Sequence, residues 1–141
     1  MEEPTPKTIK KGFTSGTGRR KTAIASVFLY AEKGDILVND VNIDEWYTLE
    51  KDKVKWMRPF HLIGVSHPNS QFSGTIKIKG SGKSAQLGAI VHGISQALSR
   101  INEEYSKLLH KQGLLTRDPR MVERKKYFLR KARKKPQYSK R

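Results

Sequence analysis

Basic side chains gather at two places in this chain of 141 residues, and both groups can bind phosphate. Residues 113–141 carry 12 lysines and arginines against two acidic residues, and Gly18–Lys21 carries three cations in a row. Residues 22–112 carry 11 basic and 9 acidic groups, so most of the formal charge of +16 belongs to the two ends. Clustered cations bind a polyanion by releasing its condensed counterions. This distribution predicts a nearly neutral folded centre with two polyanion-binding ends.

The C-terminal segment, residues 113–141, has features that a merely solvated basic tail lacks. Arginine recurs along it beside lysine, and a planar guanidinium binds phosphate oxygens in pairs. Tyr127, Phe128 and Tyr138 lie among the cations and offer faces on which unpaired bases can stack. Phe128 and Leu129 form too small an apolar face for a helix that lies on a membrane. These features favour a nucleic acid as the partner.

The local sequence also predicts how this segment is arranged. Asp118 and Pro119 are typical of a helix cap and first helical residue, after which Arg120 and Arg124 share one face. The last 15 residues, if extended, would reach about 50 Å from the domain. About eight phosphate contacts would give a salt slope of roughly −6 for binding to single strands. No zinc finger, zipper or recognition helix is present, which favours structured RNA, with a general DNA-compacting protein as an alternative.

A further place for phosphate chemistry is the glycine-rich stretch Gly80–Ser84, between a predicted strand and a predicted helix. A nucleotide-binding P-loop needs a glycine five residues before its Gly-Lys-Ser, and Lys77 stands at that position. We interpret the stretch as a tight turn whose backbone, with Lys83, can still receive an anion at a helix start. A nucleotide-dependent enzyme that uses this stretch is the rival hypothesis.

The remaining reactive residue types form no pattern that predicts an enzyme. His61, His67, His92 and His110 lie in different predicted elements, and none has a partner at metal-ligand spacing. The chain has no cysteine, so thiolate metal sites and thiol nucleophiles are excluded. No serine stands in a Gly-x-Ser-x-Gly turn. We expect no catalytic residue, no metal site and no cofactor.

Three segments have the pattern of β-strands. Thr22–Tyr30 is β-branched and aromatic with two largely apolar faces, which predicts a central strand covered on both sides. Lys33–Asp35 predicts a turn, and Ile36–Val38 a short strand that returns to form a hairpin. Gly74–Lys79 alternates, with its two isoleucines on one face and its lysines on the other.

Four segments have the pattern of helices. Asp44 is expected to cap a short helix that ends near Leu49, and a second helix is expected from Glu50 until Pro59 disrupts it, with Leu49, Val54 and Met57 inward. The third helix follows Gly80–Gly82 and is the strongest. Its apolar residues recur at i, i+3 and i+4: Leu87, Ile90, Val91, Ile94, Ala97, Leu98 and Ile101. Asn102 is expected to cap a fourth helix that Gly113 ends.

Strands and helices alternate over about ninety residues, which predicts an α+β fold with two layers. We expect a mobile arm over residues 1–17, a globular α/β domain over residues 18–112 and a basic extension over residues 113–141. The apolar run from Ala23 to Ala31 is too short to span a membrane, and the acidic N-terminus is unlike a secretory signal.

Three stretches, Gly18–Lys21, Gly88–Ile94 and Leu115–Arg141, carry a specific combination of short motifs. The last contains Thr-Arg-Asp, Val-Glu-Arg-Lys-Lys, Leu-Arg-Lys-Ala-Arg and Gln-Tyr-Ser-Lys-Arg in that order. From about Gly16 to its end, the chain resembles the family of the ninth small-subunit ribosomal protein. The closing Ser-Lys-Arg resembles the bacterial and organellar branch.

The resemblance implies a fold with a left-handed βαβ crossover, of the ribosomal-protein-fifth-domain-like type, with extended basic tails. It also implies a structural constituent of the small ribosomal subunit that binds ribosomal RNA (rRNA) in the head. The implied partners are small-subunit rRNA, peptidyl-site tRNA and other head proteins, without a membrane, a cofactor or a free homo-oligomer. The implied location is the bacterial cytoplasm, with the plastid stroma as the alternative.

The resemblance and the charge pattern together give the expected contacts. The tail should reach the anticodon stem-loop of peptidyl-site tRNA with Lys140 and Arg141. Family members carry an arginine where this chain has Ser26 and a basic residue where it has Val91, so no RNA contact is assigned at these two positions. The expected rRNA contacts are Arg19, Arg20, Lys21, Lys83, Arg117, Arg120, Arg124, Lys125, Lys126, Arg130, Lys131, Arg133, Lys134, Lys135 and Tyr138.

Overall fold

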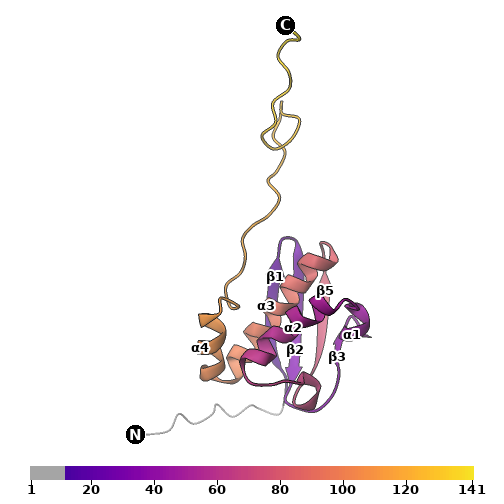
Figure 1. Ribbon diagram of the computed structural model, residues 1–141, viewed down its shortest axis with the longest axis vertical. Helices are drawn as coiled ribbons and strands as arrows, with labels where there is room; N and C mark the ends of the chain where they lie inside the picture. Colours follow the sequence, from indigo (N-terminus) through magenta and orange to yellow (C-terminus); the bar gives the residue numbers. More distant parts are fainter. Residues whose placement is uncertain (1–11) are drawn as a thin grey trace.

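The computed structural model describes residues 12–141, and the part of the expected arm over residues 1–11 lies outside them. One five-stranded sheet carries helices on one of its faces (Figure 1), which confirms the two-layer α+β prediction. The strands, in the sheet order β1-β2-β5-β3-β4, are β1 (Thr14–Arg20), β2 (Ala23–Tyr30), β5 (Ser73–Lys79), β3 (Ile36–Val38) and β4 (Val41–Asn42). The helices are α1 (Ile43–Trp46), α2 (Glu50–Leu62), α3 (Lys83–Ile101) and α4 (Glu103–Lys111), with a 3₁₀ turn over Pro68–Ser70.

The crossover from β3 to β5 has the hand that the resemblance implies. These two strands are the parallel pair of the sheet, and α1 and α2 lie in the connection between them. In Figure 1 the helices lie in front of the sheet, both strands run upward, and the path moves leftward from β3 to β5. Such a path is left-handed, whereas nearly all parallel crossovers are right-handed.

The core lies between the sheet and α3, and alternation along the strands builds it. Ile76 and Ile78 of β5 are buried while Lys77 and Lys79 are exposed, as predicted. On α3 the buried residues include Leu87, Ile90, Ile94, Ala97 and Leu98, which confirms the predicted apolar stripe. Sheet and helix thus bury their apolar faces against each other.

Strand β1 packs on α3 with almost no side chain between the two backbones. A Cβ atom on Gly18 would lie 1.7 Å from the Ala89 carbonyl oxygen, and one on Gly16 would lie 2.2 Å from that of Gly93. The expected arm is therefore wrong over residues 14–17, which belong to the sheet. In the sequence, the glycines at alternate positions favoured the prediction of a mobile segment. In the structure, their missing side chains let the strand approach the helix closely.

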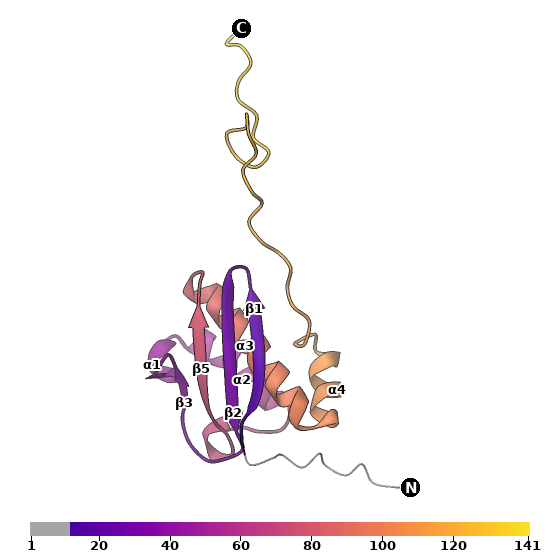
Figure 2. The same cartoon turned by 180° about the vertical axis from the view of Figure 1, so that it is seen from behind.

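Strand β2 differs from the prediction in two ways: helices cover one of its faces instead of both, and it pairs with a different strand. Its second face is open, and Ile24 is 46% exposed, because α3 covers only the other face (Figure 2). The predicted hairpin with residues 36–38 is also wrong. Seven residues of β2 pair with β5, and β3 lies on the far side of β5. The longer pairing forms more ladder hydrogen bonds than a three-residue strand offers.

Helix α2 continues to Leu62, past Pro59, which the sequence had predicted would disrupt it. Trp56, Pro59 and Phe60 are its buried residues. Leu49 is 56% exposed and Val54 is 64% exposed, so neither points inward as predicted. Burial of two aromatic side chains offsets the lost backbone hydrogen bond at the proline.

The ends of the other helices follow from their caps. Asn42, rather than Asp44, caps α1, which ends at Trp46 instead of Leu49. Asn102 caps α4 as predicted, since its Oδ1 accepts a hydrogen bond from the Glu104 amide. Gly113 has φ +70° and follows the last turn of α4.

Candidate nucleic-acid interface

Four of the expected contact residues of the domain lie at one of its ends. Arg19 and Arg20 close β1, Lys21 forms the turn to β2 with φ 50°, and Lys83 opens α3. Figures 1 and 2 show this turn and the start of α3 at the end of the domain toward which the tail extends. The fold therefore brings the first basic cluster, Lys83 and the path of the tail to the same end.

A surface hollow of about 480 Å³ opens beside this cluster, between α2, α3, the end of β1 and the residues that follow α4. Four basic residues line it: Arg19 and Arg20 from β1, and Lys55 and Arg58 from α2. The two residues of α2 were not among the expected contacts. Their i, i+3 spacing places both on one helix face, which is the only signal that the sequence offered.

The shape of α3 gives Arg20 its path into the hollow. A Cβ atom on Gly88 would lie 2.7 Å from Cδ of Arg20, so the arginine stem lies across the helix where a side chain is missing. Arg20 Nη1 then lies 2.7 Å from Oδ2 of Asp118, at the start of the tail. Gly88, from the stretch Gly88–Ile94, thus positions Arg20, from the stretch Gly18–Lys21.

Asp118 accepts hydrogen bonds from the tail itself as well. Its Oδ1 accepts from the Arg120 backbone N–H at 3.0 Å, and its Oδ2 accepts from Arg120 Nη2 at 2.7 Å. These bonds from Arg120, together with the charges of Arg120 and Arg20, hold the pKa of the Asp118 carboxyl well below its usual range. Asp118 therefore stays ionised and joins the tail to β1.

A second contact fixes the root of the tail, residues 115–118, to α3. The Leu115 carbonyl oxygen lies 3.2 Å from His92 Nε2 and accepts a hydrogen bond from Gln96 Nε2 at 3.0 Å. The Arg19 amide donates to His92 Nδ1 at 3.3 Å, so the proton of a neutral imidazole belongs on Nε2. His92 thereby bridges the end of β1 and the start of the tail.

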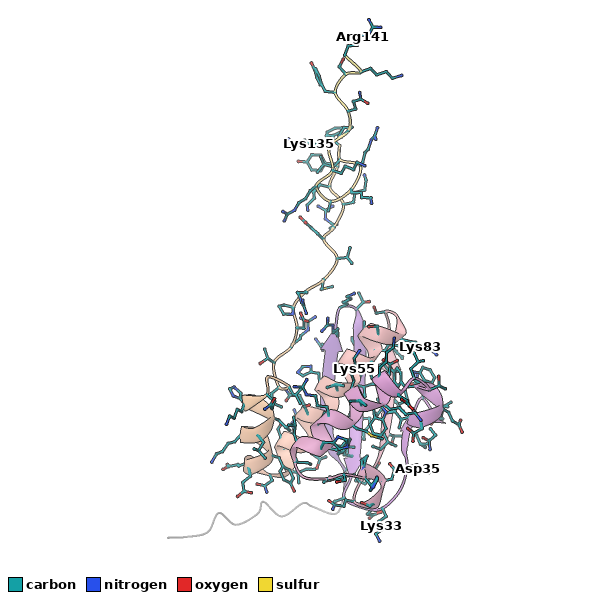
Figure 3. All side chains as sticks on the ribbon, in the orientation of Figure 1. Lys33, Asp35, Lys55, Lys83, Lys135 and Arg141 are labelled. Atoms are coloured by element: carbon teal, nitrogen blue, oxygen red, sulfur yellow. The ribbon has the colours of Figure 1, made fainter. Side chains whose placement is uncertain are left out.

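Beyond Asp118 the tail leaves the domain and extends away from it (Figure 1). It contains no helix, so the predicted helix after Pro119 is wrong. Asp118 pairs with Arg20 and Arg120. The cations that follow it are closely spaced and would repel one another on a helix, which disfavours helix formation there. Figure 3 shows Lys135 in a looped part of the tail and Arg141 at its far tip.

The expected contacts of the tail stand mostly in solvent. Glu123 pairs with Lys126 and Arg133, which lower the pKa of its carboxyl. Tyr127 and Phe128 form an edge-to-face pair with ring centroids 5.5 Å apart, and Tyr138 is fully exposed. The cations that are exposed and not gathered against the domain are Arg117, Arg124, Lys125, Arg130, Lys131, Arg133, Lys134, Lys135, Lys140 and Arg141.

In the glycine-rich stretch Gly80–Ser84, residues 80–82 make the turn between β5 and α3, and Lys83 and Ser84 begin the helix. Gly80 has φ +83°, and a Cβ atom there would lie 2.4 Å from the Thr22 carbonyl oxygen. Gln86 Nε2 closes the turn by donating to the Gly80 carbonyl at 3.2 Å. The glycine is needed for backbone conformation and close approach. Over residues 12–141, no three acidic or histidine side chains group as metal ligands, and no helix is long and apolar enough to cross a bilayer.

Comparisons with known proteins agree with one another. Residues 18–141 match the family described as ribosomal protein S9/S16. Over its full length the chain is 42% identical to the small ribosomal subunit protein uS9 of Rickettsia bellii, of which it covers 84%. It is 44% identical to the protein of the same name from Rickettsia felis, of which it covers 86%. The family match begins directly before Arg19 and includes the whole tail.

Proposed function

The chain belongs to the ribosomal protein S9/S16 family, and we propose that it binds rRNA in the head of the small subunit with its basic end and tail. It is a structural constituent of the small ribosomal subunit and not an enzyme. We further propose that Lys140 and Arg141 reach the peptidyl-site tRNA. The observation that carries the proposal is an exposed tail with net charge +10 that leaves a nearly neutral domain at its cationic end.

The physical chemistry of the tail supports an RNA partner. Among the described residues, its 12 cations have only Asp118 and Glu123 as acidic partners within the tail, so most of their charge is available to phosphates. Counterion release then drives binding without any base-specific contact. Tyr127, Phe128 and Tyr138 add exposed stacking faces for unpaired bases.

The assembly context follows from the same proposal. Relatives from two bacteria are named as small-subunit proteins, which supports a location on ribosomes in the bacterial cytoplasm. There the chain is expected to lie beside other proteins of the head and not to form a free homo-oligomer. Co-sedimentation with small subunits after a high-salt wash is the expected behaviour.

Removal of residues 119–141 should abolish most rRNA binding, because it deletes 11 of the 12 tail cations and keeps the root held by Asp118. Binding to a transcript of the small-subunit head should weaken at least a hundredfold at 0.1 M salt, and the salt slope should fall from about −6 to about −2. Filter binding over a salt series measures both quantities.

Two controls accompany this truncation. Its melting temperature should match that of the full chain, which shows that the domain stays folded. Duplex DNA should compete less well than the transcript at equal phosphate concentration, because it offers no unpaired bases for the exposed aromatic rings of the tail. An unchanged RNA affinity and slope after truncation would contradict the proposed role of the tail.

Replacement of Lys140 and Arg141 by alanine should weaken tRNA binding at the peptidyl site at least tenfold, because a single hydrogen bond to a charged group contributes about 1.5–3 kcal/mol. The tRNA dissociation rate from subunits assembled with the variant measures this effect. The double variant Lys134→Ala/Lys135→Ala removes the same charge from the looped part of the tail and should leave tRNA dissociation unchanged. Equal rates for both variants would refute a specific role of the terminus.

A further inference from the structure

The α2 wall of the hollow carries two cations that belong to neither basic end of the sequence. Lys55 and Arg58 are exposed on α2, and Figure 3 places Lys55 on the helical side of the domain. Both line the same hollow as Arg19 and Arg20, which come from a segment about 35 residues earlier. The tertiary fold therefore makes one cationic cluster from two separate segments.

The charges in this hollow are poorly balanced. Asp118 is its one acidic lining residue, against four lysines and arginines. Within residues 12–141, Arg19 and Arg58 form no ion pair, and Lys55 lies 4.0 Å from Asp52. Such a surplus of positive charge around a surface recess favours the binding of an anion.

We propose that this hollow binds a phosphate group of the rRNA backbone, held by Arg20, Lys55 and Arg58. This inference rests on the proposed function and adds a site on the domain to the contacts of the tail. Arg20 uses Nη1 for Asp118, and a guanidinium has five N–H groups, so the others remain for phosphate oxygens. The hydroxyls of Ser84 and Thr116, which also line the hollow, supply neutral donors.

The open shape of the hollow favours a phosphate within a strand over a small free anion. Its volume of about 480 Å³ exceeds what one phosphate fills, and its apolar floor of Leu87 and Val91 can accept a sugar. Gly113, Leu114, Thr116 and Asp118 form the wall on the tail side. A phosphate bound here contacts the domain and the tail root together, so it fixes the direction in which the tail leaves.

The double variant Lys55→Gln/Arg58→Gln tests the site in the full chain, with head-domain rRNA transcript as the probe. We expect about a tenfold loss of affinity at 0.1 M salt and a salt slope smaller by about 1.5. Lys51→Gln/Lys107→Gln removes the same charge from exposed positions of α2 and α4 outside the hollow. This control should change affinity less than twofold.

A second variant leaves the charge unchanged. Gly88→Ala places a methyl group 2.7 Å from the Arg20 stem and should displace that guanidinium from the hollow. RNA affinity should fall several-fold, while the melting temperature stays within about 2 °C of the parent. Hydrogen exchange at residues 116–118 should slow when RNA binds the parent chain, and not when it binds Lys55→Gln/Arg58→Gln.

Three outcomes separate this inference from the proposed function. Equal affinity losses in the hollow variant and its charge-matched control would overturn the phosphate site, while the truncation result would still support the tail. Loss only in the hollow variant, with no effect of truncation, would support the site and refute the tail. Saturable binding of inorganic phosphate below 1 mM (roughly 4 kcal/mol) to the free chain would assign the hollow to a small anion and overturn the RNA assignment.

Discussion

Asp118 is the residue through which the folded domain and the tail interact electrostatically. Its carboxylate accepts from Arg120 within the tail and pairs with Arg20 across the hollow. His92 supports the same junction, because it bridges the Arg19 amide and the Leu115 carbonyl oxygen. Each contact is small and partly exposed, so the junction depends on several contacts acting together rather than on one strong pair.

The lowered pKa of Asp118 predicts how the junction responds to acid. Part of this lowering comes from the charge of Arg20, which acts on Asp118 only when the root is docked. Docking is therefore favoured above the ordinary aspartate value of about 4 and weakens progressively as the pH falls from there through the lowered pKa. Asp118→Asn should loosen residues 116–120 at every pH between 6 and 3. Backbone heteronuclear NOE values for these residues measure the effect.

Glu123→Gln is the matched control for this titration. It removes an equal charge from a carboxyl that pairs with Lys126 and Arg133 further along the tail. The root should keep its order in this variant and should still loosen in acid. A root that is equally ordered in Asp118→Asn and in the parent chain at pH 6 would show that the ion pair does not hold it.

Among the secondary-structure elements, the contact between β1 and α3 does most to place the basic residues. Gly16 and Gly18 face the helix at Ala89, Gly93 and Ala97, so the two backbones lie in direct contact. Because β1 lies this close, the side chain of Arg20 at its end reaches the hollow between α3 and α2. The element contact therefore determines where the cations of the domain point.

Gly18→Ala should destabilise the domain by about 3 kcal/mol, because the new methyl group meets backbone that cannot move aside. Its Cβ would lie 1.7 Å from the Ala89 carbonyl oxygen and 2.4 Å from the Gly93 nitrogen. Urea unfolding followed by circular dichroism gives the free energy of unfolding. A loss of less than about 1 kcal/mol would mean that β1 does not pack as described.

Gly82→Ala provides the comparison for this substitution. No atom lies within 4 Å of a Cβ there, and the residue has an ordinary extended backbone with φ −93°. Gly82 caps α3 without a side-chain hydrogen bond, so alanine should change the free energy of unfolding by less than about 1 kcal/mol.

For the molecule as a whole, the separation of charge from core explains why one chain can be both a stable domain and a polyanion ligand. Residues 22–112 carry a net charge of only +2 and contain nearly all of the buried apolar residues. The tail carries +10, buries little, and repels itself into an extended path. The truncation at Asp118 is expected to keep its melting temperature for this reason.

Local pattern was sufficient for the elements whose neighbours lie close in sequence. The stripe of Leu87, Ile90 and Ile94 predicted α3, the alternation of residues 74–79 predicted β5, and Asn102 predicted the start of α4. The same local reasoning failed at Pro59, because burial of Trp56 and Phe60 overrides the cost of a proline in a helix. It also failed after Asp118: the carboxylate accepts from the Arg120 amide as a cap does, but no helix follows, because the closely spaced cations beyond it repel one another.

The sequence by itself determined the charge division, the α+β class, the tail and, through its motifs, the family. Only the tertiary structure decided that residues 14–17 belong to the sheet, that β3 lies beside β5, and that Lys55 and Arg58 share a hollow with Arg20. Composition and periodicity are properties of neighbouring residues, so a sequence displays them directly. Strand order and a cluster drawn from distant segments depend on which surfaces pack together, and here two glycines without side chains allowed that packing.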